Sequence, residues 1–206
     1  MSKKPYYLFA PLFTSFSLFT SLFTLLMLLL YSIPSYAKEP KWVHVELLIF
    51  ENKDKAAFQN YSSIAGVPVL TGAINLNPDP QENYGQLPPH KLTLNKVKQT
   101  MEKEKYPLLL HTGWRQMLTD KNNADRVHLV GERIAQNNHQ VDGIIKLALG
   151  KHLLMDADLL FHKMNENGEL SVNTYRLKES SRLKYNEINY IDHPLFGVIM
   201  MITAEK

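Results

Sequence analysis

The longest regular stretch of the sequence, from Gly143 to Phe161, alternates apolar and polar side chains. The apolar residues that share one parity are Ile145, Leu147, Leu149, Leu153, Met155, Ala157, Leu159 and Phe161. A period of two places successive side chains on opposite faces of a strand, so the stretch predicts β-structure with one buried face. Gly150-Lys151 interrupts the pattern, and we expect a break or a bulge there.

A hairpin signal follows this stretch. Asn167-Gly168 stands between a strand-like segment at 152–164 and another at 169–177. Both turn positions tolerate a positive φ, which two-residue hairpin turns require. The sequence therefore predicts that these segments pair in an antiparallel manner.

The remaining regular segments complete a predicted α+β fold. Apolar residues at Leu94, Val97 and Met101 have helical spacing and predict one surface helix within 92–105. Three further segments predict strands, at 42–50, 108–115 and 198–203. A fourth, at 126–134, fits either a strand or a helix, and we favour a strand. We expect a single domain with a mainly antiparallel β-sheet, one surface helix and a long Pro-rich loop.

Two irregular regions lie between the predicted elements. Residues 51–90 hold five of the eleven prolines and predict a loop-rich insertion, which at this length is typical of functional or disordered segments. Residues 185–198 combine aromatics, Asp192-His193-Pro194 and Gly197, and predict a shaped corner that leads into the last strand.

The first 37 residues have the composition of a leader. Lys3 and Lys4 precede an uncharged apolar run, and Ser35-Tyr36-Ala37 provides the small residues of a cleavage site. We expect a signal peptide at 1–37, cleaved near Ala37, and a single periplasmic domain at 38–206. An uncleaved membrane anchor is the alternative for the apolar run.

The cysteine content and the net charge limit how the chain can be stabilised and what it can bind. The chain has no cysteine, so an exported form cannot use disulfides and must hold its fold by core burial. The formal net charge is +3, of which the leader supplies two lysines. A nearly neutral domain lacks the broad positive footprint of nucleic-acid binding, so no nucleic-acid partner is expected. No membrane span is expected after cleavage.

Catalytic and metal-binding patterns are weak. Asp192-His193 suggests acid-base chemistry, but neighbours on an extended chain point to opposite faces. The sequence has no G-x-S-x-G, no H-E-x-x-H and no cysteine nucleophile. A metal site would have to combine separate strands, for instance through His111, His152 and His162. We therefore predict no enzyme activity, no metal and no cofactor.

Aromatic and guanidinium groups interleave at several positions of the chain. Sugar rings stack on aromatic faces, and arginine binds carboxylates through paired hydrogen bonds. A ligand with both amino sugars and peptide carboxylates would use both groups, whereas the alternative is that the aromatics are core residues covered by arginine stems. The predicted ligand-binding residues are Trp114, Arg115, Arg182, Tyr190, Asp192 and His193.

The sequence resembles the CsiV family of bacterial periplasmic peptidoglycan-binding proteins, named for cell-shape integrity. The resemblance lies in residues 43–50, 106–116, 143–159 and 190–199, and its most specific part is Tyr-x-Asp-His-Pro-x-x-Gly-Val at the last of these. It implies a non-enzymatic factor of cell-wall biogenesis that binds peptidoglycan. It also implies support of a class A penicillin-binding protein through the outer-membrane lipoprotein that activates that synthase.

Two other functions remain open from the sequence. One is an envelope hydrolase that uses Asp192 and His193. The other is a small outer-membrane β-barrel, suggested by the alternating strands.

Overall fold

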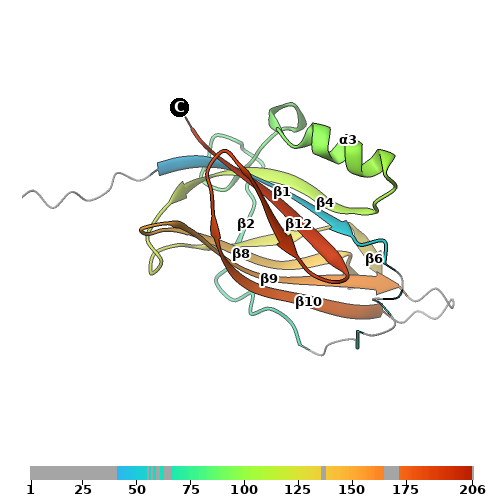
Figure 1. Cartoon of the computed structure of the whole chain (residues 1–206). Coiled ribbons are helices and arrows are strands. Elements are labelled where there is room, and N and C mark those ends of the chain that lie inside the picture. The colour runs from blue at the N-terminus through green and yellow to red at the C-terminus, as the bar shows by residue number, and fades with distance from the viewer. Residues whose placement is uncertain are drawn as a thin grey trace, which may run out of the picture. The chain divides into compact units, whose positions relative to one another are not determined.

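The strands form two five-stranded sheets that face each other across one core (Figure 1). The computed structural model describes residues 41–54, 56, 58, 61–62, 66–135, 138–164 and 172–205. In sheet A the order is β11 (Ile188–Asp192), β12 (Phe196–Ala204), β1 (Lys41–Glu51), β4 (Leu108–Leu118) and β3 (Gly85–Gln86). In sheet B it is β10 (Val172–Leu183), β9 (Leu153–Met164), β8 (Val141–Leu149), β5 (Arg126–Val130) and β2 (Ile74–Asn75).

Pairing between the named strands is antiparallel except for the short parallel contact of β2 with β5. A separate ribbon pairs β6 (Arg133–Ala135) with β7 (Asn138–His139). Strand β1 lies between β12 and β4 and pairs with both along most of its length. Residues from opposite ends of the chain therefore meet at β1.

The core lies between the sheets and follows the period-two pattern. On β1 the inward residues are Val43, Val45, Leu47 and Ile49, each with 0% exposure. On β9 the inward residues are Leu153, Met155, Ala157, Leu159 and Phe161, all buried. Burial of such side chains is worth about 2 kcal/mol each, which lets a chain without cysteine hold two sheets together.

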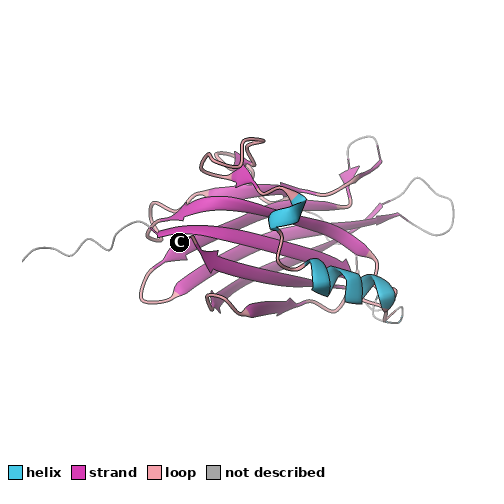
Figure 2. Ribbon diagram, turned by 90° about the horizontal axis from the view of Figure 1, so that it is seen from above, coloured by secondary structure: helices cyan, strands magenta, loops and turns pink. Residues whose placement is uncertain are grey.

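A second, smaller apolar cluster covers the outer face of sheet A. Leu48, Phe50 and Ile199 point away from the main core and pack beneath helix α3 (Asn95–Lys103). Val97 and Met101 of the helix contact this cluster. Figure 2 shows the longer helix, α3, lying over one side of the strands and running nearly along them. None of the helices in the described part of the chain is long and apolar enough to cross a membrane.

The structure confirms the main prediction of antiparallel β-structure with a surface helix. Residues 143–161 are two strands, β8 and β9, joined by a tight turn at Gly150-Lys151. Strands β9 and β10 pair as the hairpin signal predicts, although Asn167-Gly168 lies outside the described residues, as does the predicted leader.

Several details of the prediction were wrong. The strands divide between two sheets, because the inward residues of β1 and of β9 are apolar and are buried against each other in one core. The predicted strand at 126–134 is two strands, separated at Gly131-Glu132. The predicted corner at 185–198 contains an additional edge strand, β11, which pairs with β12. The loop-rich insertion at 51–90 stays a prediction, and its described residues carry only two-residue strands, β2 and β3, and a short 3₁₀ helix, Pro89–Lys91.

Gly143 is required by the close approach of β8 to β9. Its φ is 157°, and a Cβ built there would lie 2.3 Å from the backbone oxygen of Asp158 and 2.7 Å from the Cα of Leu159. Because these are backbone atoms of the neighbouring strand, the clash cannot be relieved by a rotamer change. A side chain at this position would push two central strands of sheet B apart.

We expect Gly143→Ala to lower the free energy of unfolding by about 3 kcal/mol, measured by urea denaturation. Gly150→Ala is the matched control, since a Cβ there would meet its nearest atom at 3.9 Å. That control should change stability by less than about 0.5 kcal/mol. Equal effects of the two substitutions would contradict the strand packing described here.

Candidate functional site

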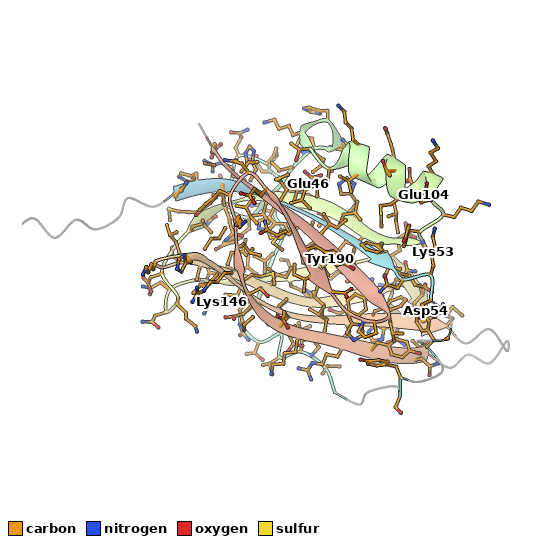
Figure 3. The ribbon with its side chains drawn as sticks, in the orientation of Figure 1. Glu46, Lys53, Asp54, Glu104, Lys146 and Tyr190 are labelled. Carbon is orange, nitrogen blue, oxygen red and sulfur yellow. The ribbon has the colours of Figure 1, made fainter. Side chains whose placement is uncertain are left out.

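An aromatic surface lies at the end of the outer face of sheet A, formed by Phe50, Tyr106, Tyr190 and the ammonium of Lys53. Tyr190 on β11 is 54% exposed, and its ring stacks on Phe50 with centroids 6.4 Å apart and planes 15° apart. Phe50 meets Tyr106 edge to face at 5.4 Å, and the Lys53 Nζ lies 4.1 Å from the centre of the Tyr106 ring. Tyr190 and Lys53 are labelled in Figure 3. The surface offers one open ring face supported by buried aromatic packing.

Gly197 makes the stacking of Phe50 and Tyr190 possible. A Cβ at this position would lie 2.5 Å from the Phe50 Cζ and 3.0 Å from the Tyr190 Cε2. Gly197 pairs with Phe50 on one side and with Asp192 on the other. The glycine that follows the Asp-His-Pro motif therefore leaves room for the two rings to approach each other across β12.

Asp192 extends the aromatic surface with a carboxylate. Tyr190 and Asp192 are two residues apart on β11 and share a face, and the Tyr190 hydroxyl donates to the Asp192 Oδ1 at 2.7 Å. Burial, together with this hydrogen bond, raises the pKa of Tyr190 to about 12. The phenol therefore stays protonated at neutral pH and fixes the position of the carboxylate.

His193 is engaged separately from Asp192. Its Nδ1 accepts a hydrogen bond from the Leu195 N–H at 3.2 Å, and its ring packs 4.6 Å from Phe196 and 5.5 Å from Tyr61. Its backbone oxygen accepts from the Asn52 side chain at 2.8 Å. Burial lowers the pKa of His193, against the opposing effect of the Asp192 charge. The imidazole thus shapes the turn between β11 and β12.

The other three predicted residues lie elsewhere. Trp114 has 0% exposure in the core, where its Nε1 donates to the Gln116 Oε1 at 2.6 Å. Its ring is therefore not open to a ligand in this structure. Arg115 points to the outer face of sheet A, stacks 3.5 Å from the centre of the Trp42 ring and binds Glu205 at 2.9 Å.

Arg182 is exposed on sheet B, beside a small cavity of about 220 Å³ that Ser180, Ser181 and Lys121 also line. Of the six residues predicted to bind a ligand, the structure brings Tyr190, Asp192 and His193 together. It places Trp114, Arg115 and Arg182 apart from them.

A buried carboxylate that sequence reasoning missed organises the middle of the outer face. Glu46 on β1 is 4% exposed and accepts four hydrogen bonds: from the backbone and hydroxyl of Thr93, from the backbone of Leu94 and from the His111 ring. We call these four residues the Glu46 network. Helix α3 has Leu94 as its N-cap with no side-chain cap of its own, so Glu46 takes that role from a neighbouring strand. Figure 3 labels Glu46 on sheet A.

The protonation of Glu46 reflects its partners. Burial alone would raise the pKa of this carboxyl, but the hydrogen bonds from His111, Thr93 and Leu94 outweigh burial and hold the pKa below its usual range. A negative charge also interacts favourably with a helix N-terminus. The network is therefore an ionised clamp between β1, β4 and α3.

Two of the histidines that a strand-built metal site would need, His111 and His162, bond to different partners. His111 bonds to Glu46 on sheet A, whereas His162 bonds to the Thr174 hydroxyl on sheet B. In the part of the chain that the structure describes, no group of three or more His, Asp or Glu side chains is placed to hold a metal ion.

Comparison with known families identifies the chain. The model of the family described as peptidoglycan-binding protein, CsiV, matches residues 63–204. The chain belongs to the CsiV family. No curated protein and no solved structure matches it.

The part of the chain that matches the CsiV family includes most of the features described above. It contains α3, β4, Tyr190, Asp192 and His193. It begins after β1, so Glu46 and Phe50 lie before the matched residues. Two interactions therefore join the unmatched strand β1 to the matched part of the chain. They are the hydrogen bonds of Glu46 to the start of α3 and the stacking of Phe50 on Tyr190.

We expect Glu46→Gln to lower the free energy of unfolding by about 2 kcal/mol at pH 7, because the buried network loses its negative charge and one of its two acceptor oxygens becomes an NH2 group that faces other donors. The lowered pKa of Glu46 adds stability above the usual carboxyl pKa, and this contribution is lost as the pH falls through the folded-state value. The wild type should therefore lose more stability than the variant between about pH 5 and pH 3.

Glu104→Gln is the control for this substitution. Glu104 is exposed at the C-terminal end of α3, so its replacement should leave stability within about 0.5 kcal/mol. Chemical denaturation over this pH range checks both. Parallel pH profiles of wild type and Glu46→Gln would contradict an ionised clamp.

Proposed function

We propose that the protein is a non-enzymatic periplasmic factor that binds peptidoglycan and supports cell-wall synthesis. The observation that carries the proposal is membership of a family described as peptidoglycan-binding, over residues 63–204. The leader-like composition of residues 1–37 supports export to the compartment where that polymer lies. The near-neutral composition is consistent with a ligand that has both charged peptides and uncharged sugars.

The proposed glycan contact is the aromatic surface around Tyr190. A sugar ring presents an apolar face that stacks on an exposed aromatic ring, and Tyr190 is held ready by its packing on Phe50. Asp192 lies beside the ring as an acceptor for sugar hydroxyls. Such a site binds repeating sugars without acting on them. His193 contributes by shaping the turn that carries both side chains.

The arrangement of Asp192, His193 and the Glu46–His111 pair supports binding over turnover. Asp192 accepts from Tyr190, and the Nδ1 of His193 accepts from the backbone of Leu195. His111 and Glu46 do pair, at 2.8 Å, but both side chains are less than 10% exposed and the carboxylate caps α3. Each of these groups has a structural task.

The proposed wider role is support of a class A penicillin-binding protein through the outer-membrane lipoprotein that activates that synthase. Resemblance to the CsiV family supports this role. The test is crosslinking in cells followed by identification of the attached protein. Recovery of a synthase activator supports the role, and consistent recovery of unrelated envelope proteins without it overturns it.

We expect Tyr190→Ala to weaken binding to isolated sacculi about tenfold, because loss of the ring removes the stacking platform. Tyr190→Phe keeps the ring and should bind within about twofold of the wild type. Co-sedimentation at several protein concentrations measures both, with thermal unfolding to verify the fold. Failure of the wild-type protein to sediment with sacculi would refute peptidoglycan binding itself, and full binding by Tyr190→Ala would refute this site.

A further inference from the structure

Strand β4 has a free edge next to β3. On one side β4 pairs with β1 from Leu108 to Leu118, whereas on the other side β3 pairs with it at Trp114 and Arg115. Pro88 and Pro89 follow β3, and proline has no N–H to continue a ladder. The described residues therefore leave the first half of β4 unpaired on this side.

The backbone of His111 points toward that free edge. The Gly113 carbonyl accepts from the Leu87 N–H at 2.8 Å, so the backbone groups of Gly113 face away from β1. Alternate residues of a strand direct their N–H and C=O to the same side, so those of His111 do likewise. In the described part of the chain neither group has a hydrogen-bond partner. At Leu109 the edge is covered by the Gly131 segment, because the Leu109 carbonyl oxygen lies 3.2 Å from a Cβ built on Gly131.

Three adjoining cavities surround this backbone position, with volumes of about 450, 260 and 410 Å³, and His111 lines all three. We call them together the β4 groove. The largest lies between α3, β4 and the turn after β5, the smallest beside Gln86 and His128, and the third against four prolines. If the backbone of a peptide ligand paired with the backbone of His111, its side chains on both sides would enter existing cavities.

The largest cavity carries charges of both signs. Lys98 and Glu102 of α3 line it from one side, and Glu132 lines it from the other. Lys98 and Glu102 form a loose ion pair at 3.8 Å, with side chains 39% and 51% exposed. Exposed pairs of this kind are weak, so both groups are available to a ligand at little cost. The groove suits a ligand that has carboxylate and ammonium groups close together.

The Glu46 network makes the groove rigid. The His111 ring is held by Glu46, and the same carboxylate fixes the start of α3. Backbone and helix therefore keep their spacing without a ligand, which lowers the entropic cost of binding.

We propose that the β4 groove binds the short peptides of peptidoglycan, with the ligand backbone paired to His111 and its charges matched by Lys98, Glu102 and Glu132. This inference rests on the proposed function and assigns the peptide part of the polymer to a site of its own. These peptides are a few residues long and bear free carboxylates and, on the cross-linking diamino acid, a free amino group. The open edge of β4 is short, because the segment with Pro88 bounds it at one end and Leu109 bounds it at the other. A protein segment added as a strand would need a longer open edge.

The test compares two polymers and three variants. Binding is measured by co-sedimentation with intact sacculi and with glycan strands from which an amidase has removed the peptides. The variants are Lys98→Glu and Glu132→Lys in the groove, and Lys103→Glu on the same helix as the control, since Lys103 does not line the groove. Thermal unfolding verifies that each variant folds. Competition uses the free tripeptide of alanine, glutamate and diaminopimelate.

We expect the wild type to bind intact sacculi about tenfold more tightly than peptide-free glycan, and the free tripeptide to remove that difference. Each groove variant should lose about fivefold in affinity for intact sacculi, and Lys103→Glu should keep the wild-type affinity.

Equal binding to both polymers overturns the inference but leaves the proposed function intact, whereas binding to neither overturns both. Unchanged binding by both groove variants overturns the location. A strand-forming peptide of Val and Thr with capped ends tests whether the groove binds protein strands instead. If this peptide binds and the tripeptide does not displace it, the groove is a protein-docking edge and the inference is overturned.

Discussion

The structure depends on strand β1 being buried on both faces. Its odd-numbered residues fill the core between the sheets, and Leu48 and Phe50 on the other face need a second cover, which α3 supplies. A helix of nine residues is too short to be stable alone in water. Its start is held by Glu46 from the strand that it covers, so one polar residue on β1 positions the helix that hides the apolar residues beside it.

Local patterns predicted the strands, but not how they assemble. The alternation through β8 and β9 is visible because neighbours in sequence are also neighbours in the sheet. Strand β1 instead pairs with β12 and β4, which lie far from it in the chain, and no period in the sequence records that pairing. The division into two sheets follows from it. Strand β11 was missed because its outer residues, Ile188 and Tyr190, are more than half exposed and give no clear apolar alternation.

The candidate site was predictable where its residues share a strand. Tyr190 and Asp192 stand two apart and lie on one face, as period two requires. The same rule separates Trp114 from Arg115, since adjacent strand residues point to opposite faces and Trp114 enters the core. Glu46 and His111 are 65 residues apart, so their pairing depends on the register of β1 with β4. The sequence signal that could have pointed to this pair was the carboxylate of Glu46 between the apolar residues Val45 and Leu47.

Sheet A places the two proposed contacts with peptidoglycan on different strands. The aromatic surface lies on edge strand β11, and the groove lies beside β4, with β12 and β1 between them. Phe50 supports Tyr190, while Glu46, four residues earlier on β1, holds the His111 ring and the start of α3. A polymer that presents sugars along its strand and charged peptides from its side matches two separated contacts of different chemistry. Because both contacts rest on β1, a change that shifts this strand would disturb them together, whereas substitutions at Tyr190 or Lys98 separate them.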